Sequence, residues 1–214
     1  MINQKFFNAE TGVYAEGTQT AQALALYLGL VPEGKEQLVA DKLREVVAGN
    51  NYFLDFGLLG SKTVPAMLTK YGYIEDAMKM ITKTEAPSWG YWVETMGYST
   101  LPETWTLSPK FADASLNHVF MGDVSAWMMN QLAGINHDDS APGFRHIRIT
   151  PHFVKELDWA KGEYHSVRGL ISSQWKREGD KVTLTVTIPS GCTADIRVGD
   201  KTETVGSGTY VNTY

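Results

Sequence analysis

The chain has 214 residues, of which 43% are hydrophobic and 20% charged, with a formal net charge of −5 and a single cysteine. The mixed charges exclude the basic stripe of a nucleic-acid-binding protein, and one cysteine excludes an internal disulfide framework. No run approaches the roughly 20 apolar residues of a membrane span, and the first twelve residues do not form a signal peptide, so the native compartment stays open.

Apolar periodicity predicts that the first part of the chain is helical. The expected helices span residues 18–30, 34–48, 63–71, 73–83 and 116–133. Thr18 or Thr20 would cap the first helix and Ser115 the last. The third would start at Thr63, which places Pro65 in its first turn. The connections are short, so neighbouring helices should run antiparallel.

Residues 85–114 interrupt this periodicity with three prolines and two glycines. A loop of this length inside a compact domain usually has a function. The segment gathers three tryptophans and two tyrosines close to acidic residues in the sequence, namely Trp89, Tyr91, Trp92, Tyr98 and Trp105. Flat apolar rings suit the C–H faces of sugars, and the alternative is a well-packed core.

The helix expected over 116–133 has one apolar face, while His118, Gly122 and Ser125 fall on another. This arrangement suits the inner ring of an αα-barrel, where one face packs outward and the other lines the lumen. His118 would lie near the positive end of the helix dipole, which together with burial favours a neutral imidazole. The alternative is a hydrogen-bonded core histidine.

After residue 143 the pattern changes to the period of two that is typical of strands. Strands are expected over residues 145–150, 164–177, 180–188 and 193–206, with hairpin turns at 178–180 and 199–201. The predicted fold class is therefore α+β in series, with an α-helical domain over residues 1–140 and an antiparallel β-sandwich over 141–214.

The candidate chemistry rests on carboxylates, since the chain has no phosphate-binding glycine loop and no zinc motif. We expect neither a cofactor nor a metal. Glycoside hydrolysis needs two acids across the scissile bond, and the irregular segment contains Glu85, Glu94 and Glu103. Glu103 stands out because Pro102 restricts its backbone and Trp105 follows closely; the alternative is a solvated side chain.

Two stretches carry a resemblance to a known family, "PSWGYWVETMGYSTLPETW" and "SLNHVFMGDVSAWMMNQLAGI". They resemble the C-terminal part of the catalytic barrel of α-L-rhamnosidases, glycoside hydrolase family 78. The matching motifs lie at residues 87–91, 97–103, 115–118 and 133–135. "GFRHIRITPHF" and the strands after it resemble the C-terminal β-domain of that family, so the resemblance covers nearly the whole chain.

The resemblance implies the C-terminal half of an (α/α)6 barrel followed by a β-sandwich, in an inverting enzyme that hydrolyses terminal α-L-rhamnose. Glu103 would be the general base and His118 a contact to the sugar. Trp89, Tyr91 and Trp92 would form the apolar wall of the sugar pocket. Pro102 stands where the family usually has tryptophan, which puts the shape of the pocket in question.

The general acid of the family lies in an acidic motif upstream, and this chain has no such motif. We therefore expect a C-terminal fragment that is inactive alone and whose partners are the missing N-terminal half and a carbohydrate. Two alternatives stay open. One is another (α/α)6 glycosidase, fucosidase- or glucosidase-like, and the other is a non-catalytic carbohydrate-binding or scaffold fragment.

Overall fold

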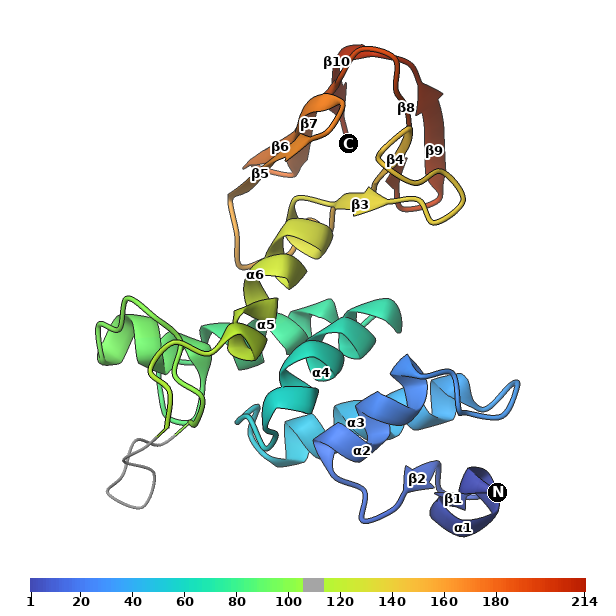
Figure 1. Ribbon diagram of the computed structural model, residues 1–214, viewed down its shortest axis with the longest axis vertical. Helices are drawn as coiled ribbons and strands as arrows, with labels where there is room; N and C mark the ends of the chain where they lie inside the picture. The colour runs from blue at the N-terminus through green and yellow to red at the C-terminus, as the bar shows by residue number, and fades with distance from the viewer. Residues whose placement is uncertain (106–113) are drawn as a thin grey trace. The chain divides into compact units, whose positions relative to one another are not determined.

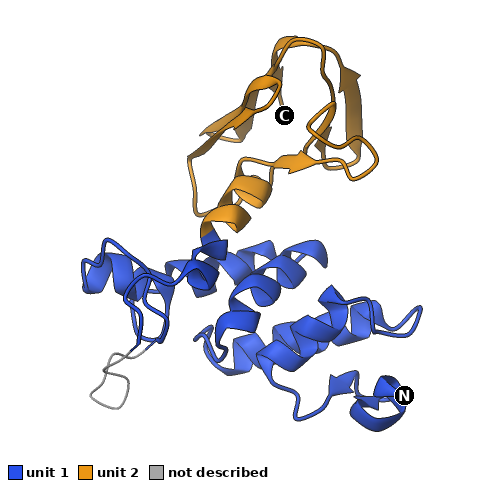
Figure 2. Ribbon diagram, viewed as in Figure 1, with its two compact units in different colours: residues 1–124 blue, residues 125–214 orange. Residues whose placement is uncertain are grey.

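The computed structural model describes residues 1–105 and 114–214. The chain forms two compact units, Met1–Val124 and Ser125–Tyr214 (Figure 2). Residues 106–113, which belong to the irregular segment predicted from the sequence, lie outside the described residues.

Helices dominate the first unit (Figure 1). A short helix and a two-stranded hairpin come first, α1 (Ile2–Phe6), β1 (Phe7–Asn8) and β2 (Val13–Tyr14). Four longer helices follow, α2 (Gln19–Tyr27), α3 (Glu36–Gly49), α4 (Leu58–Lys70) and α5 (Ile74–Thr82). Helix α2 packs against α3 and α4, and α4 packs against α5.

Local sequence explains most of these helices. The Thr18 side chain accepts a hydrogen bond of 3.2 Å from the amide of Ala21, which confirms the predicted cap of α2. In α3 the buried positions Val39, Leu43 and Val47 recur every four residues, as expected for one face of a helix.

The predicted start at Thr63 is wrong, because α4 begins at Leu58 and Pro65 lies in its interior. A proline removes one helical hydrogen bond, and burial along this helix offsets that loss. The close approach of Phe56 also requires Gly60, where an added Cβ would lie 2.2 Å from the Cβ of Phe56.

The continuous helix predicted over 116–133 is also wrong. Residues 115–118 are not helical, and His118 has an extended backbone with φ −112° and ψ 119°. Three short pieces follow, the 3-10 helix η3 (Val119–Gly122), α6 (Asp123–Trp127) and the π-helix η4 (Met128–Leu132). The Ser115 hydroxyl accepts from the amide of Asn117 and caps no helix. The physical reason is that the backbone of 115–118 hydrogen-bonds to the segment around Glu103 instead.

The second unit contains eight strands, β3 (Ile135–His137), β4 (His146–Ile149), β5 (Trp159–Ser166), β6 (Gly169–Glu178), β7 (Lys181–Ile188), β8 (Thr193–Val198), β9 (Lys201–Val205) and β10 (Gly208–Thr213). They form two four-stranded sheets, ordered β10-β7-β6-β5 and β3-β4-β8-β9. The expectation of purely antiparallel pairing is wrong at one place, because β4 pairs with β8 in parallel.

The predicted hairpin turns are confirmed. Glu178 pairs with Lys181 and Val198 pairs with Lys201, so each loop has two residues. Each loop begins with a glycine of positive φ, as two-residue hairpin loops favour. The stretch 164–177, where the sequence predicts strands, contains the end of β5 at Ser166 and most of β6 from Gly169, and β5 and β6 form a hairpin.

Both sheets contribute to one hydrophobic core, which includes Ile147 and Ile196 from one sheet and Trp175 and Leu184 from the other. The indole of Trp175, which is fully buried, donates a hydrogen bond of 2.8 Å to the carbonyl of Leu132. Within the described ranges, no helix is both long and apolar enough to cross a membrane.

Candidate functional site

Two backbone segments of the first unit lie side by side and bring Glu103 and His118 onto neighbouring stretches of chain. The amide of Glu103 donates to the carbonyl of Ser115 at 2.8 Å, and the amide of His118 donates to the carbonyl of Leu101 at 2.8 Å. The hydroxyl of Thr100 donates to the carbonyl of Leu116 at 2.7 Å. The structure therefore places the two backbone segments that carry the predicted site residues side by side.

The carboxylate of Glu103 is itself held by this pairing. Its Oε2 accepts a hydrogen bond of 3.1 Å from the backbone amide of Ser115, and the side chain is half-buried. A backbone donor does not titrate and has no rotamer freedom, so it fixes the carboxylate without neutralising it. A carboxylate oriented in this way can accept a proton from a water molecule.

Pro102 lies between the two hydrogen-bonded residues of this segment and is buried. Leu101 and Glu103 make the bonds to the neighbouring segment, and Pro102, which has no N–H to donate, lies between them.

His118 lies immediately before η3 and stacks against Phe120, with ring centroids 5.7 Å apart. Its Nδ1 atom is buried and has no hydrogen-bond partner among the described residues. The prediction that a long helix places His118 near a strong dipole is wrong, because η3 has only four residues.

An aromatic cluster packs around Trp105, two residues after Glu103. The ring of Trp105 stacks on Trp92 at 4.4 Å and meets Trp89 edge-on at 5.2 Å and Phe56 at 5.8 Å. Its indole N–H donates to the carbonyl of Phe56, and that of Trp89 donates to the carbonyl of Met121 at 3.0 Å. The cluster thus fixes Trp105, which follows Glu103 by two residues in the chain.

Burial divides the predicted aromatic contacts into two kinds. Trp89 and Trp92 are only 3% and 1% exposed, whereas Tyr91 is half-buried. The two tryptophans therefore pack in the core of the first unit. The roles of Trp89, Tyr91 and Trp92 as contacts to a sugar stay predictions.

Sequence reasoning missed the residues that support the site from the helices. Ser61 in α4 donates to the carbonyl of Phe120 at 3.0 Å, close in sequence to His118. The buried Gln19 in α2 bonds both to the carbonyl of Phe53 at 3.0 Å and to the amide of Asp55 at 3.1 Å, just before Phe56. In the sequence, the signal for this second contact is a glutamine at the start of an apolar helix, because a buried amide needs hydrogen-bond partners.

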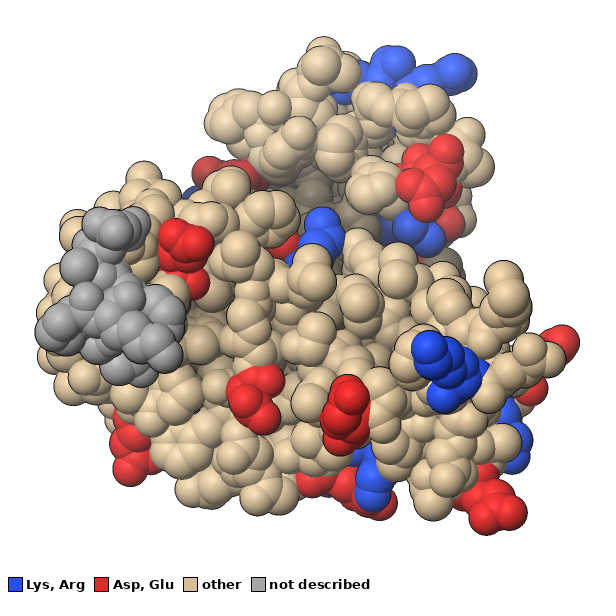
Figure 3. All heavy atoms as spheres, turned by 60° about the horizontal axis from the view of Figure 1, so that its bottom comes forward, with Lys and Arg blue, Asp and Glu red and all other residues tan. Residues whose placement is uncertain are grey.

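Acidic and basic side chains are scattered among the described residues on the face shown in Figure 3, with no continuous basic patch in that view. In the described ranges, no group of three or more His, Cys, Asp or Glu side chains is arranged to hold a metal ion.

Two family models together match almost the entire chain. Residues 1–132 match the bacterial alpha-L-rhamnosidase 6 hairpin glycosidase domain, and residues 134–211 match the bacterial alpha-L-rhamnosidase C-terminal domain. An alpha-L-rhamnosidase from Streptomyces avermitilis is 29% identical over 199 residues, which are 90% of this chain and 19% of that protein. The chain spans about a fifth of the length of the curated relatives it matches.

Solved structures agree with these matches. The crystal structure of the alpha-L-rhamnosidase from Aspergillus terreus superposes with a TM-score of 0.91 at 27% identity, over 99% of this chain and 25% of the other. The Streptomyces avermitilis alpha-L-rhamnosidase complexed with L-rhamnose gives a TM-score of 0.89 at 26% identity, over 99% of this chain and 23% of the other.

Proposed function

The chain belongs to the bacterial α-L-rhamnosidases, with their six-hairpin glycosidase domain followed by their C-terminal domain, and we propose that its parent protein is an inverting glycoside hydrolase. The substrate class is terminal α-L-rhamnose on glycosides or polysaccharides. The single observation that carries this proposal is the carboxylate of Glu103, held by the backbone amide of Ser115 beside the His118 segment.

Glu103 acts as the general base. In an inverting reaction the base removes a proton from a water molecule, which attacks the anomeric carbon from the face opposite the leaving group. The general acid then stands roughly 6.5–9.5 Å from the base, which leaves room for that water. The acid comes from the rest of the parent polypeptide, which supplies the other hairpins of the barrel. His118 contacts a sugar hydroxyl.

The architecture follows from the same proposal. Helices α2 to α5 and the short helices up to residue 132 form the C-terminal half of an (α/α)6 barrel. The two four-stranded sheets, which share one core, form a β-sandwich. The catalytic and β domains would divide near residue 140, and the two family models meet near residue 133.

The test is Glu103→Gln in the full-length parent, assayed with an aryl α-L-rhamnoside. Glutamine keeps the shape and can still accept from the Ser115 amide, but it is not a base, so kcat should fall by about 10²–10⁴-fold. Glu94→Gln, at an exposed glutamate of the same segment, is the matched control and should leave kcat unchanged. A near-normal rate for Glu103→Gln would disprove the assignment.

Two further readouts define the reaction. Proton NMR of the first sugar released should show the β-anomer, since inversion converts the α-glycoside. Initial release of the α-anomer would show that the enzyme retains the anomeric configuration, and it would contradict the proposed inversion. Aryl α-L-fucoside and aryl α-glucoside should be poor substrates beside the rhamnoside, and a preference for either would change the substrate class.

A further inference from the structure

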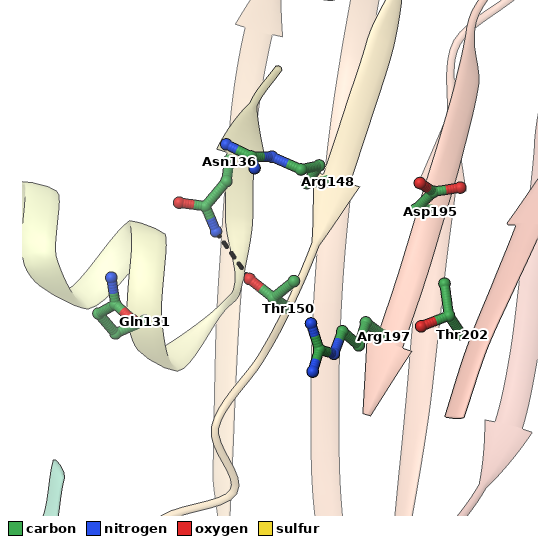
Figure 4. A pocket seen from close by; sticks show the side chains of 7 residues that line it. All are labelled: Gln131, Asn136, Arg148, Thr150, Asp195, Arg197 and Thr202. Carbon is green, nitrogen blue, oxygen red and sulfur yellow. Dashed lines mark hydrogen bonds between the residues drawn. The ribbon is translucent and has the colours of Figure 1, made fainter. Parts of the chain in front are cut away.

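A polar hollow of about 390 Å³ lies on the sheet β3-β4-β8-β9, within the second unit and outside the Glu103 site (Figure 4). It is lined by Gln131, Asn136, Arg148, Thr150, Asp195, Arg197 and Thr202. Its volume falls at the lower end of the roughly 300–1,000 Å³ typical of ligand pockets.

Strand register places five of these side chains on one face, namely Asn136, Arg148, Asp195, Arg197 and Thr202. Asn136 pairs with Arg148, Arg148 pairs with Asp195, and Arg197 pairs with Thr202. Alternate residues of a strand point to opposite faces, and the intervening residues Ile147, Ile149, Ala194 and Ile196 are buried in the core. The strand register that directs these apolar side chains into the core therefore also directs the polar side chains to the opposite face of the sheet.

Two arginines dominate the charge of the hollow. The Nε atom of Arg148 donates to the carbonyl of His137 at 3.1 Å, and that of Arg197 donates to the carbonyl of Gly199 at 3.3 Å. Neither guanidinium lies within 4.0 Å of a carboxylate among the described residues. In Figure 4 the guanidinium of Arg148 lies beside Asn136, and that of Arg197 points toward Thr150. Each is therefore anchored through Nε with its terminal nitrogens left for a ligand, and such nitrogens match the two oxygens of a carboxylate.

The acid in the hollow is already engaged. Asp195 accepts from the hydroxyl of Thr204 at 2.6 Å, and its other oxygen lies 3.1 Å from Nε2 of His146. Both contacts come from side chains beside the hollow rather than from the arginines. Asp195 consequently leaves the guanidinium groups free to meet an external anion.

Amides and a hydroxyl supply neutral hydrogen-bonding groups next to the arginines. The two hydrogens of the Asn136 Nδ2 are shared among the carbonyls of Asn130 and Gly134 and, at 3.0 Å, the hydroxyl of Thr150. These bonds fix the orientation of the amide and leave its carbonyl oxygen as an acceptor. A ligand that carries both an anionic group and several hydroxyls fits this set.

We propose that the polar hollow binds an acidic saccharide unit, with its carboxylate between Arg148 and Arg197 and its hydroxyls on Asn136, Gln131 and Thr202. The choice of a saccharide rests on the proposed glycoside hydrolase function, whereas the choice of a carboxylate rests on the arginines alone. Such a site would hold an acidic part of a polysaccharide away from the bond that is cleaved.

The direct test is a titration of the ¹⁵N-labelled 214-residue chain, followed by NMR. D-galacturonate and D-glucuronate are compared with the neutral sugars D-galactose and D-glucose. We expect at least one acid to shift the backbone signals of residues around Arg148 and Arg197, with an affinity about tenfold or more above its neutral counterpart. Equal binding of acid and neutral sugar, or no shift with either acid, would overturn the proposal.

Variants assign the binding to the arginines. Arg148→Gln and Arg197→Gln should each weaken the acid about tenfold, and Arg145→Gln, an exposed arginine that does not line the hollow, should leave the affinity unchanged. Each variant's spectrum also reports whether the fold is intact. An unchanged affinity in both hollow variants contradicts the proposal.

Two further arms separate the sources of the signal. Acetate and inorganic phosphate supply anions without a sugar, and they should bind at least about tenfold more weakly than the preferred uronate. Equal binding of acetate would reduce the hollow to a simple anion site and refute the saccharide. Glu103→Gln should leave uronate binding intact, so failure of this proposal and failure of the hydrolase proposal are distinguishable.

Discussion

The amide of Ser115 donates a hydrogen bond of 3.1 Å to Oε2 of Glu103, and the amide of Glu103 donates one of 2.8 Å to the carbonyl of Ser115. The two residues thus hold each other through one side-chain and one backbone contact. This reciprocal pair sets the direction of the carboxylate and also prevents residues 115–118 from joining the helical pieces that follow.

Ser115→Pro in the full-length parent removes the amide that holds the Glu103 carboxylate. A hydrogen bond to a charged group contributes about 1.5–3 kcal/mol, so kcat should fall by roughly 10–100-fold. Ser115→Ala keeps the amide and removes only the hydroxyl, and it should retain nearly normal kcat. Equal rates for the two variants would mean that the amide does not orient the base.

The 214-residue chain alone should not hydrolyse an aryl α-L-rhamnoside. A base without its general acid leaves the departing oxygen unprotonated, so half of the mechanism is missing. The measurement compares the chain with its own Glu103→Gln variant and with the full-length parent as the positive control. Turnover by the chain that Glu103→Gln abolishes would show that the acid lies within these residues.

Trp92→Ala should destabilise the helical unit by about 3–5 kcal/mol, because it removes a large buried side chain and leaves a cavity beside Trp105. Trp92 is 1% exposed and stacks on Trp105 at 4.4 Å. The measurement is urea unfolding of the chain, followed by far-ultraviolet circular dichroism.

The matched control is Trp159→Ala, since Trp159 is 62% exposed. Its effect on the free energy of unfolding should stay within about 0.5 kcal/mol. A loss for Trp92→Ala as small as that for Trp159→Ala would show that the buried packing of Trp92 does not stabilise the unit.

His152 should make the stability of the second unit depend on pH. Burial lowers the pKa of His152 from its ordinary value of 6.5, and the hydrogen bond from its ring to the carbonyl of Gln131 opposes that shift only in part. The folded state therefore binds fewer protons than the unfolded state between the lowered pKa and 6.5. The free energy of unfolding therefore keeps its full contribution from His152 above the unfolded-state pKa of 6.5, and it falls as the pH is lowered through this window.

The measurement is urea unfolding from about pH 8 to about pH 5.5, where carboxylates with lowered pKa values such as Asp195 stay ionised in both states. His152→Asn places an amide donor close to the position of Nδ1 but cannot titrate. It should lower stability at high pH and flatten the fall toward acid pH. A fall of the same slope in the variant would assign the pH dependence to another group.

The sequence by itself determined the elements whose contacts are local. The four-residue spacing of Val39, Leu43 and Val47 predicts the buried face of α3, and alternation predicts β7. The glycines at 179 and 199 predict two hairpin turns because two-residue loops need positive φ there. The family motifs also selected Glu103 and His118.

The tertiary structure decided what depends on distant partners. Residues 115–118 have an acceptable helical pattern, but hydrogen bonds to residues 101–103 are long-range and no local period records them. The parallel pairing of β4 with β8 joins strands that are separated by three others in the chain. The burial of Trp92 follows from its stacking on Trp105, and the polar hollow follows from cross-strand register. Each of these is fixed by packing between segments, which local propensity does not encode.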